Sequence, residues 1–284
     1  MFANLSPGAI GIRTDLAGGV ALAARHGWAG CDLPAGEAAR LAAERSVDEV
    51  AAIFAQAGVR PGGWGLPINW REPYDQAALT TLAEQAAVAA QLGCTRSYTW
   101  LMPASNDRPF RENFAFHVAQ LRPIAQVLAE HGCQLGLEFI GPRTMRESHR
   151  YGFIYSPEAM LGLAEAIGPN AGLLLDCWHW YTAVGAAADI RTLRAEDIVY
   201  VHVNDAPTGV AVEAQIDQVR QLPGATGVID IAGFLQALRE IGYDGPVTPE
   251  PFDKQLAARP ADESCEIARD AMRKIWQVAG LEAA

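Results

Sequence analysis

Short apolar runs alternate with longer stretches of helical periodicity along nearly the whole chain. Several of the later runs are continuously apolar rather than alternating, which is the pattern of parallel strands that are covered on both faces. We interpret eight runs as strands: 9–14, 30–35, 60–67, 95–103, 134–141, 171–180, 198–207 and 246–252.

The stretches between these runs carry the start and stop signals of helices. In 75–92, Asp75 can cap the first turn, apolar residues form a stripe, and Gly93 can end the helix. A polar cap before the segment and a glycine at its end also mark two later segments. Helices are therefore predicted over 75–92, 156–168 and 230–242, and a last one is expected over 261–279.

Strand and helix signals in alternation favour the α/β fold class. Eight strands interleaved with helices over residues 1–284 predict a single domain, a (β/α)8 TIM barrel, and the length is typical of one. A doubly wound open sheet is the alternative, but no GxGxxG follows the first run, which weakens its dinucleotide-binding form.

The composition is that of an ordinary soluble globular protein and excludes some partners. Half of the 284 residues are hydrophobic, yet no apolar run reaches the roughly 18 residues of a membrane span. The first residues show no signal-peptide pattern. A net charge of −11 argues against nucleic acid, which needs a concentrated basic face. The five cysteines lack CxxC spacing and are typical of reduced thiols, so we expect a cytoplasmic protein without a membrane partner.

Four residues of metal-ligand type lie toward the C-terminal ends of the last four predicted strands. They are Glu138, Asp176, His202 and Glu250. Consecutive parallel strands of a barrel are neighbours, and their C-terminal ends meet where such barrels build active sites, so the four side chains could converge on one point. Three carboxylates and one imidazole suit a divalent ion, with Mn²⁺ as the first expectation and Mg²⁺, Co²⁺ or Zn²⁺ as alternatives.

Each of the four residues also has an ordinary structural explanation when it is taken alone. Glu138 could reach solvent from a strand end, Asp176 could cap a helix, and His202 could be a hydrogen-bonded core histidine. Glu250 could lie in a loop, because prolines flank it on both sides. Their matching depth on successive strands favours a shared site. Cys177 directly follows a ligand candidate, so strand alternation turns it to the opposite face and outside the site.

Several motifs between residues 134 and 253 resemble the sugar phosphate isomerase/epimerase superfamily, the xylose isomerase-like barrels. They are GLEFIGPRT, GLLLDCWHWY, VYVHVNDAP and RQLPGATGVIDIAGFLQALREIGYDGPVTPEPF, in the order that the superfamily shows. The resemblance implies that one divalent metal is held by Glu138, Asp176, His202 and Glu250. It also implies that His179 contacts the substrate and that Arg220 binds substrate oxygens.

The resemblance further implies an isomerase or epimerase that acts on a small ketose, keto-sugar or cyclitol such as an inosose, by proton transfer through an enediolate. Glu138 and Glu250 are the expected acid–base pair, and which of them is the acid is left open. The same proton abstraction beside a leaving group gives one alternative, a dehydratase or lyase acting on an inosose or keto-glycoside. A metal-binding accessory subunit without turnover is another. Similar proteins are commonly dimers or tetramers, which leaves a homo-oligomer open.

Two further features bear on the substrate pocket. The usual PGxG turn of the superfamily is PGATG here, one residue longer, so the loop that bears Arg220 could sit differently. Trp178 and Trp180 predict either a broad aromatic wall or packing under the helices. Trp64 and Trp100 lie near predicted strand ends and are candidates for substrate binding, with core packing as the alternative.

Overall fold

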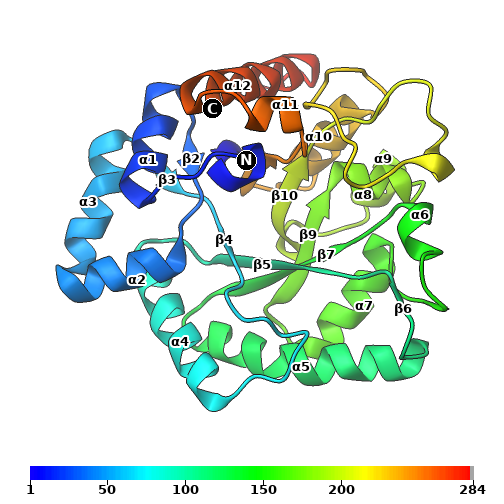
Figure 1. Cartoon of the computed structure of the whole chain (residues 1–284), viewed down its shortest axis with the longest axis horizontal. Helices are drawn as coiled ribbons and strands as arrows, with labels where there is room; N and C mark the ends of the chain where they lie inside the picture. The colour runs from blue at the N-terminus through cyan, green and yellow to red at the C-terminus, as the bar shows by residue number, and fades with distance from the viewer. Residues whose placement is uncertain (282–284) are drawn as a thin grey trace.

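The computed structural model describes residues 1–281, and its parallel strands form a central barrel with helices around the outside (Figure 1). The strand order is β3-β2-β1-β11-β10-β9-β7-β5-β4. The strands are β1 (Phe2–Leu5), β2 (Gly30–Cys31), β3 (Arg60–Pro61), β4 (Trp64–Gly65), β5 (Arg96–Leu101), β7 (Gln134–Phe139), β9 (Ala171–Asp176), β10 (Ile198–Val203) and β11 (Pro246–Pro249). A separate small antiparallel pair joins β6 (Ala104–Ser105) to β8 (Tyr151–Gly152). The prediction of a TIM barrel is confirmed.

The barrel closes through a strand that two glycines interrupt. β3 pairs with β2, β4 pairs with β5, and only Gly62 and Gly63 separate β3 from β4. A Cβ on Gly63 would lie 2.6 Å from the ring of Tyr200, so a side chain does not fit there. The segment 60–65 is therefore the third of eight strand positions, and it is bonded to a neighbour on each side.

Long helices cover the outside of the barrel. They are α1 (Leu16–Arg25), α2 (Ala35–Glu44), α3 (Val47–Ala57), α4 (Gln76–Gln91), α5 (Phe110–Glu130), α7 (Pro157–Ile167), α10 (Ile231–Glu240) and α12 (Ala261–Val278). Predictions for α4, α7, α10 and α12 are confirmed to within about two residues, and Asp75 and Asp230 accept capping hydrogen bonds from backbone N–H groups. Ser156 takes the cap position of α7 without a side-chain hydrogen bond. No helix within residues 1–281 has both the length and the apolarity to cross a membrane.

Short helical turns lie in the connections. They are η1 (Pro7–Ile10), α6 (Arg143–Arg146), α8 (Cys177–Thr182), α9 (Ala187–Ile190), η2 (Ala195–Asp197), η3 (Val212–Ala214) and α11 (Lys254–Ala257). Most of them follow the C-terminal ends of strands, where they shape the loops above the barrel.

Two strand predictions are wrong in position. The first strand is β1, whereas the run 9–14 falls in η1 and the loop after it, where Gly11 adopts a left-handed φ of 81°. Asn4 breaks the apolar pattern of β1 because its side chain points into a polar network inside the barrel. The run 171–180 is a strand only as far as Asp176, and its remainder is the helix α8.

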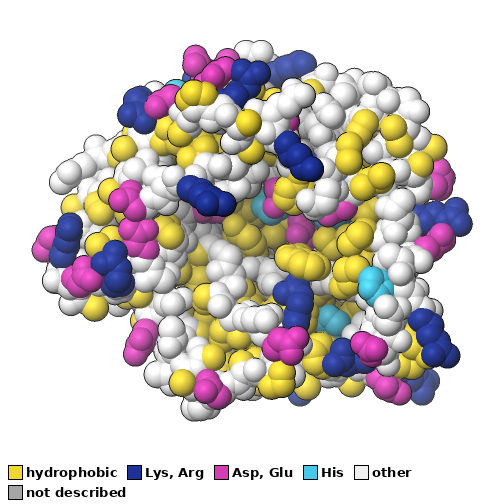
Figure 2. Space-filling model, in the orientation of Figure 1, with side chains coloured by type: hydrophobic (Ala, Val, Ile, Leu, Met, Phe, Trp, Pro, Cys, Tyr) yellow, Lys and Arg dark blue, Asp and Glu magenta, His cyan; other side chains and the backbone are white. Residues whose placement is uncertain are grey.

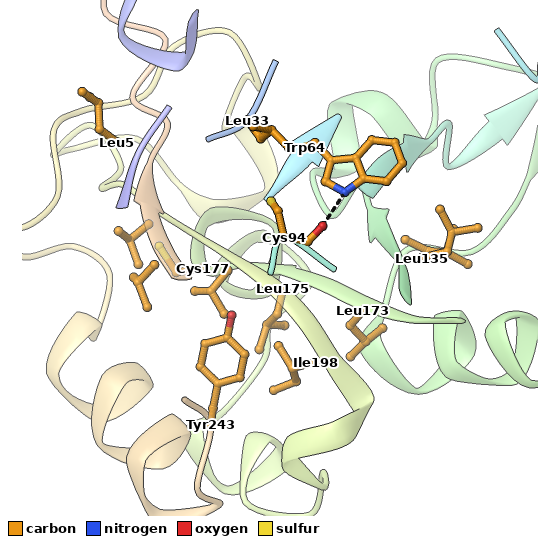
Figure 3. Packing of buried hydrophobic residues seen from close by; sticks show 14 of the residues in the cluster. Leu5, Leu33, Trp64, Cys94, Leu135, Leu173, Leu175, Cys177, Ile198 and Tyr243 are labelled. Carbon is orange, nitrogen blue, oxygen red and sulfur yellow. Dashed lines mark hydrogen bonds between the residues drawn. The ribbon is translucent and has the colours of Figure 1, made fainter. Parts of the chain in front are cut away.

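Buried hydrophobic side chains fill the space between strands and helices (Figure 3). Inside the barrel, a polar network includes the carboxylate of Asp32, which accepts hydrogen bonds from the Asn4 amide and from the hydroxyls of Tyr98 and Tyr200 at 2.8 Å each. The Asn4 amide also donates to the hydroxyl of Thr248 at 2.9 Å. This network joins β1, β5, β10 and β11 beneath the C-terminal ends of the strands.

Candidate metal centre

Four side chains meet at the C-terminal ends of β7, β9, β10 and β11. They are Glu138, Asp176, His202 and Glu250, and one ligand atom from each lies within 4.8 Å of all the others. Strand register explains the convergence, because His202 on β10 is opposite Asp176 on β9, while Glu250 follows β11 and its N–H bonds to Val203 of β10 at 3.1 Å. We call these four residues the ligand cluster.

The ligand cluster is nearly closed off from solvent. Asp176 is fully buried, Glu138 and His202 are 7% and 4% exposed, and only Glu250 is partly accessible. Nδ1 of His202 lies 3.3 Å from a Glu138 oxygen and 3.4 Å from a Glu250 oxygen. Three carboxylates this close together repel one another unless positive charge lies among them.

Arg220 supplies part of that positive charge. Its guanidinium donates to Asp176 at 2.8 Å and to Glu250 at 3.0 Å, and it also bonds to Asp217 at 2.7 Å. The rings of Trp178 and Phe252 lie on it, with centroids 4.9 Å and 4.3 Å from the guanidinium carbon. Arg220 therefore lies beside the ligand cluster despite the longer PGATG turn, and its binding of substrate oxygens stays a prediction.

The loop that carries Arg220 is fastened to the end of β10 by one carboxylate. Asp205 accepts four backbone hydrogen bonds, from Ala206 at 2.8 Å, Thr226 at 2.9 Å, Gly227 at 2.7 Å and Ile229 at 3.0 Å. Backbone bonds in both directions between Asp205 and Gln221 add a β-bridge. The positions of Asp217 and Arg220 thus depend on a buried anchor outside the ligand cluster.

His179 lies beside the ligand cluster at the start of α8. Its Nδ1 accepts a hydrogen bond from the Gly141 N–H at 3.2 Å, which places the ring proton on Nε2. Nε2 faces the Arg220 guanidinium at 3.0 Å and an Asp217 oxygen at 3.7 Å. An oxygen placed to one side of this pair, within hydrogen-bond distance of both nitrogens, would accept from Nε2–H and from the guanidinium.

The electrostatics of the protein alone favour bound protons in the ligand cluster. Burial raises the pKa of Glu138 to about 7 and also raises that of Glu250. Burial alone would lower the pKa of His202, but the carboxylates of Glu250 and Glu138 raise it to about 9. Burial would raise the pKa of Asp176, but Arg220 beside it holds that pKa below its usual range. Burial and Arg220 lower the pKa of His179 to about 4, so it stays neutral.

The donor set fits a divalent ion. Oxygen-rich sets with one imidazole suit Mn²⁺, Mg²⁺, Co²⁺ or Zn²⁺, and within residues 1–281 no cysteine takes part in the cluster. Cys177 is buried at the start of α8, and its sulfur contacts the backbone of Asn204. It lies outside the cluster as predicted, although the chain has already left the strand there, so alternation is not the reason.

A cavity of about 760 Å³ opens above the ligand cluster. Its lining includes Glu138, His179, Arg220, Glu250 and Trp100. Figure 2 shows this face hollowed near its centre, with acidic and histidine side chains inside the hollow and hydrophobic side chains around it.

Three other tryptophans that the sequence suggested for the substrate pocket do not line this cavity. Trp64 is 1% exposed, and its indole N–H donates to Cys94 O at 3.1 Å (Figure 3). It borders a different cavity, beside Asp32. Trp180 packs on Phe234 under the helices, and Trp178 is fully buried behind Arg220. A broad wall built from Trp178 and Trp180 is therefore wrong, because the turn into α8 directs both indoles into the core.

Sequence reasoning missed two residues of the site, Asp217 and Phe252. Asp217 precedes Arg220 by three residues, and its carboxylate holds the guanidinium. The spacing of three residues between Asp217 and Arg220 could have indicated an ion pair. Both residues lie in a loop, however, where no periodic pattern shows which side chains face each other. Phe252 has a left-handed φ of 45°, which a sequence pattern does not reveal.

The comparisons with known proteins place the chain among barrels of one type. A family model described as "Xylose isomerase-like TIM barrel" matches residues 20–275. A solved structure of a xylose isomerase domain protein from Alicyclobacillus acidocaldarius is 30% identical, covers 99% of both chains and has a TM-score of 0.87.

Curated relatives match over shorter segments. An inosose isomerase from Halalkalibacterium halodurans is 29% identical over 53% of this chain and 50% of its own length. An L-ribulose 3-epimerase from Methylomonas sp. is 29% identical over 51% of this chain and 45% of its own. A 3-dehydroshikimate dehydratase from Pseudomonas putida is 31% identical over 39% of this chain and 17% of its own. The chain thus spans about half the length, or less, of the curated relatives that it matches.

Proposed function

Because the chain belongs to the xylose isomerase-like TIM barrel family, we propose that it is a divalent-metal-dependent isomerase or epimerase of a keto-sugar or inosose. The observation that carries the proposal is the ligand cluster, whose four donor atoms lie within 4.8 Å of one another. Two of its members, Glu138 and Glu250, line a cavity of about 760 Å³. Relatives named inosose isomerase and L-ribulose 3-epimerase support the reaction class.

In this proposal Glu138 and Glu250 move the proton. A divalent ion, when bound by the ligand cluster, polarises a carbonyl oxygen and stabilises the negative charge that develops on it. Both glutamates line the cavity, Glu138 from β7 and Glu250 from the residue after β11, so they reach a bound substrate from different directions. One takes the proton from the carbon beside the carbonyl, and the other returns a proton to the adjacent carbon or to the opposite face.

Arg220 and His179 orient the substrate in the same proposal. The His179 Nε2–H and the Arg220 guanidinium face each other at 3.0 Å, and both are donors. Two donors so placed are satisfied when a substrate hydroxyl or carbonyl oxygen accepts from both. Asp217 and the rings of Trp178 and Phe252 fix the guanidinium for this task.

A second candidate is a lyase that uses the same site. The relative named 3-dehydroshikimate dehydratase favours it, at 31% identity over 39% of this chain. Proton abstraction beside the carbonyl followed by loss of a β-hydroxyl or aglycone requires no further protein group than Glu138 and Glu250. The two outcomes differ only in the product.

Incubation of the Mn²⁺-loaded protein with a panel of ketoses and inososes in D₂O tests the proposal. An isomerase or epimerase puts solvent deuterium on carbon in a product with the same formula apart from that exchange, whereas a lyase releases water or an aglycone. Glu138→Gln should lower the rate by at least about a thousandfold, since general acid–base catalysis contributes roughly 10²–10⁴-fold and metal affinity also falls.

The matched control is Glu266→Gln, a change at an exposed position on α12, which should leave the rate within about twofold. Wild-type rates in Glu138→Gln at full metal loading would contradict the assignment. Absence of exchange with the whole panel, for fully metal-loaded protein, would count against the reaction class.

A further inference from the structure

The upper wall of the cavity differs in chemistry from its floor. Ionisable side chains make the floor, whereas large apolar side chains make the wall. The apolar ones are Trp100, Ile140, Met145, Ile216 and Phe252, and we call them the apolar rim. Trp100 and Ile216 remain 45% and 55% exposed, far more than core residues, so these two side chains are free to contact a ligand, whereas Ile140 is 5% exposed.

Trp100 is the best-positioned part of the rim. It lies on β5 directly opposite Glu138 of β7, so its indole is beside a member of the ligand cluster. The guanidinium of Arg71 lies over the indole, 4.1 Å from its centroid, and also donates to the backbone oxygen of Trp100. Arg71 is further placed over Trp70, at 4.4 Å. A ring held in this way is a preorganised platform, which lowers the entropic cost of binding.

Two uncharged polar side chains of the cavity lining, Thr144 and Gln218, each already donate a hydrogen bond within the protein. The hydroxyl of Thr144 donates to Gln215 O at 2.8 Å, and the amide of Gln218 donates to Asp217 at 3.0 Å. A substrate hydroxyl that lies against the apolar rim loses its contact with water. If it finds no hydrogen-bond partner there, binding is weakened by about 1–3 kcal/mol. An apolar group at the same place gains free energy instead.

Phe252 connects the rim to the floor. Its ring lies on Arg220 and also lines the cavity, and its backbone has a left-handed φ of 45°. Such a conformation costs a bulky residue about 1–3 kcal/mol, and strain of this kind is concentrated at ligand-binding positions. The strained backbone of Phe252 therefore places an aromatic ring between the ionisable and the apolar side chains of the cavity.

We propose that the substrate is amphiphilic, with a keto-polyol head on the ligand cluster and an apolar group of about the size of a phenyl ring against the apolar rim. This inference rests on the proposed function for the head and on the rim alone for the apolar group. The volume of 760 Å³ is in the range of sites that enclose drug-sized ligands, which leaves room beyond a single sugar ring.

Two probes that share one polyol head test the apolar subsite. Calorimetric titration of the Mn²⁺-loaded protein with phenyl β-D-glucopyranoside and with methyl β-D-glucopyranoside should give a Kd about tenfold or more lower for the phenyl compound, since burial of an aromatic ring contributes roughly 1.5–3 kcal/mol. Trp100→Ala and Ile216→Asp should reduce this ratio to below about threefold while the Kd of the methyl compound stays nearly constant.

Val278→Asp is the matched control for Ile216→Asp, because Val278 is 61% exposed on α12, away from the cavity, and it should preserve the ratio. Equal affinities for the two probes, or no measurable binding of the phenyl compound, would overturn the proposal. A change of oligomeric state in Ile216→Asp with equal probe affinities would show instead that the rim is a subunit contact. A separate titration of the methyl compound with and without Mn²⁺ tests whether the polyol head binds at the ligand cluster. Failure of the proposed function would abolish the effect of Mn²⁺, whereas failure of the apolar subsite would abolish only the difference between the two probes.

Discussion

At the scale of single residues, the ligand cluster holds protons when it holds no ion. Burial raises the pKa of Glu138 to about 7, and neighbouring carboxylates raise that of His202 to about 9 against the effect of its burial. Both groups bind protons more tightly in the folded chain than in the unfolded one. Their contribution to stability is therefore present at low pH and is lost as pH rises through about 7 for Glu138 and about 9 for His202.

This proton binding predicts how metal affinity depends on pH. An ion must displace the protons of Glu138 and His202, so the affinity for Mn²⁺ should rise with pH between about 6 and about 8.5, by up to roughly tenfold per pH unit for each proton displaced. Calorimetry in buffers of different ionisation enthalpy measures both the affinity and the protons released. An affinity that is constant over this window, with no proton release, would show that the cluster is not the binding site.

At the scale of elements, helices that begin with a capping aspartate could be predicted to within about two residues. Asp75 and Asp230 signalled helix starts because an N-cap acts locally, through the backbone of the next turn. β1 was missed because Asn4 interrupts its apolar run, and the reason for Asn4 lies in contacts with β10 and β11, distant in sequence. For Trp64, the position near a strand end could not decide between substrate binding and core packing, because the direction of the indole depends on a hydrogen bond to Cys94, distant in sequence.

The loop between β10 and α10 carries Asp217 and Arg220, and its anchor gives an element-scale prediction. Asp205→Asn puts an amide NH₂ against backbone N–H groups that now bond to a carboxylate. Asparagine keeps one acceptor oxygen, so only the bonds to the other oxygen are lost, either those of Thr226 and Gly227 or that of Ile229. That loss costs about 1–3 kcal/mol locally, so the amides on the affected side should exchange with D₂O roughly 5- to 100-fold faster.

Asp230→Asn is the control, because Asp230 ends the same loop as the N-cap of α10 and asparagine caps about as well as aspartate. It should leave exchange of those three amides within about twofold. If Asp205→Asn exchanged as slowly as the native protein, Asp205 would not be the anchor of the Arg220 loop.

At the scale of the whole molecule, barrel geometry made the centre predictable. Parallel neighbours end at the same edge, so Glu138, Asp176, His202 and Glu250 could be assigned to one point from their positions in successive runs. The wall of the cavity could be predicted less well from the sequence. Ile216 and Phe252 come from loops whose course is set by tertiary contacts, and only the folded chain brings them beside Trp100.

The proposed function depends most on one feature, the binding of a single divalent ion by Glu138, Asp176, His202 and Glu250, which come from elements far apart in the sequence. Anomalous diffraction from a crystal soaked in Mn²⁺ measures this directly. We expect one manganese peak, bonded to an atom of each of the four side chains at roughly 2.0–2.3 Å. Full Mn²⁺ loading in solution with the peak elsewhere, or with these side chains turned away from it, would contradict the account.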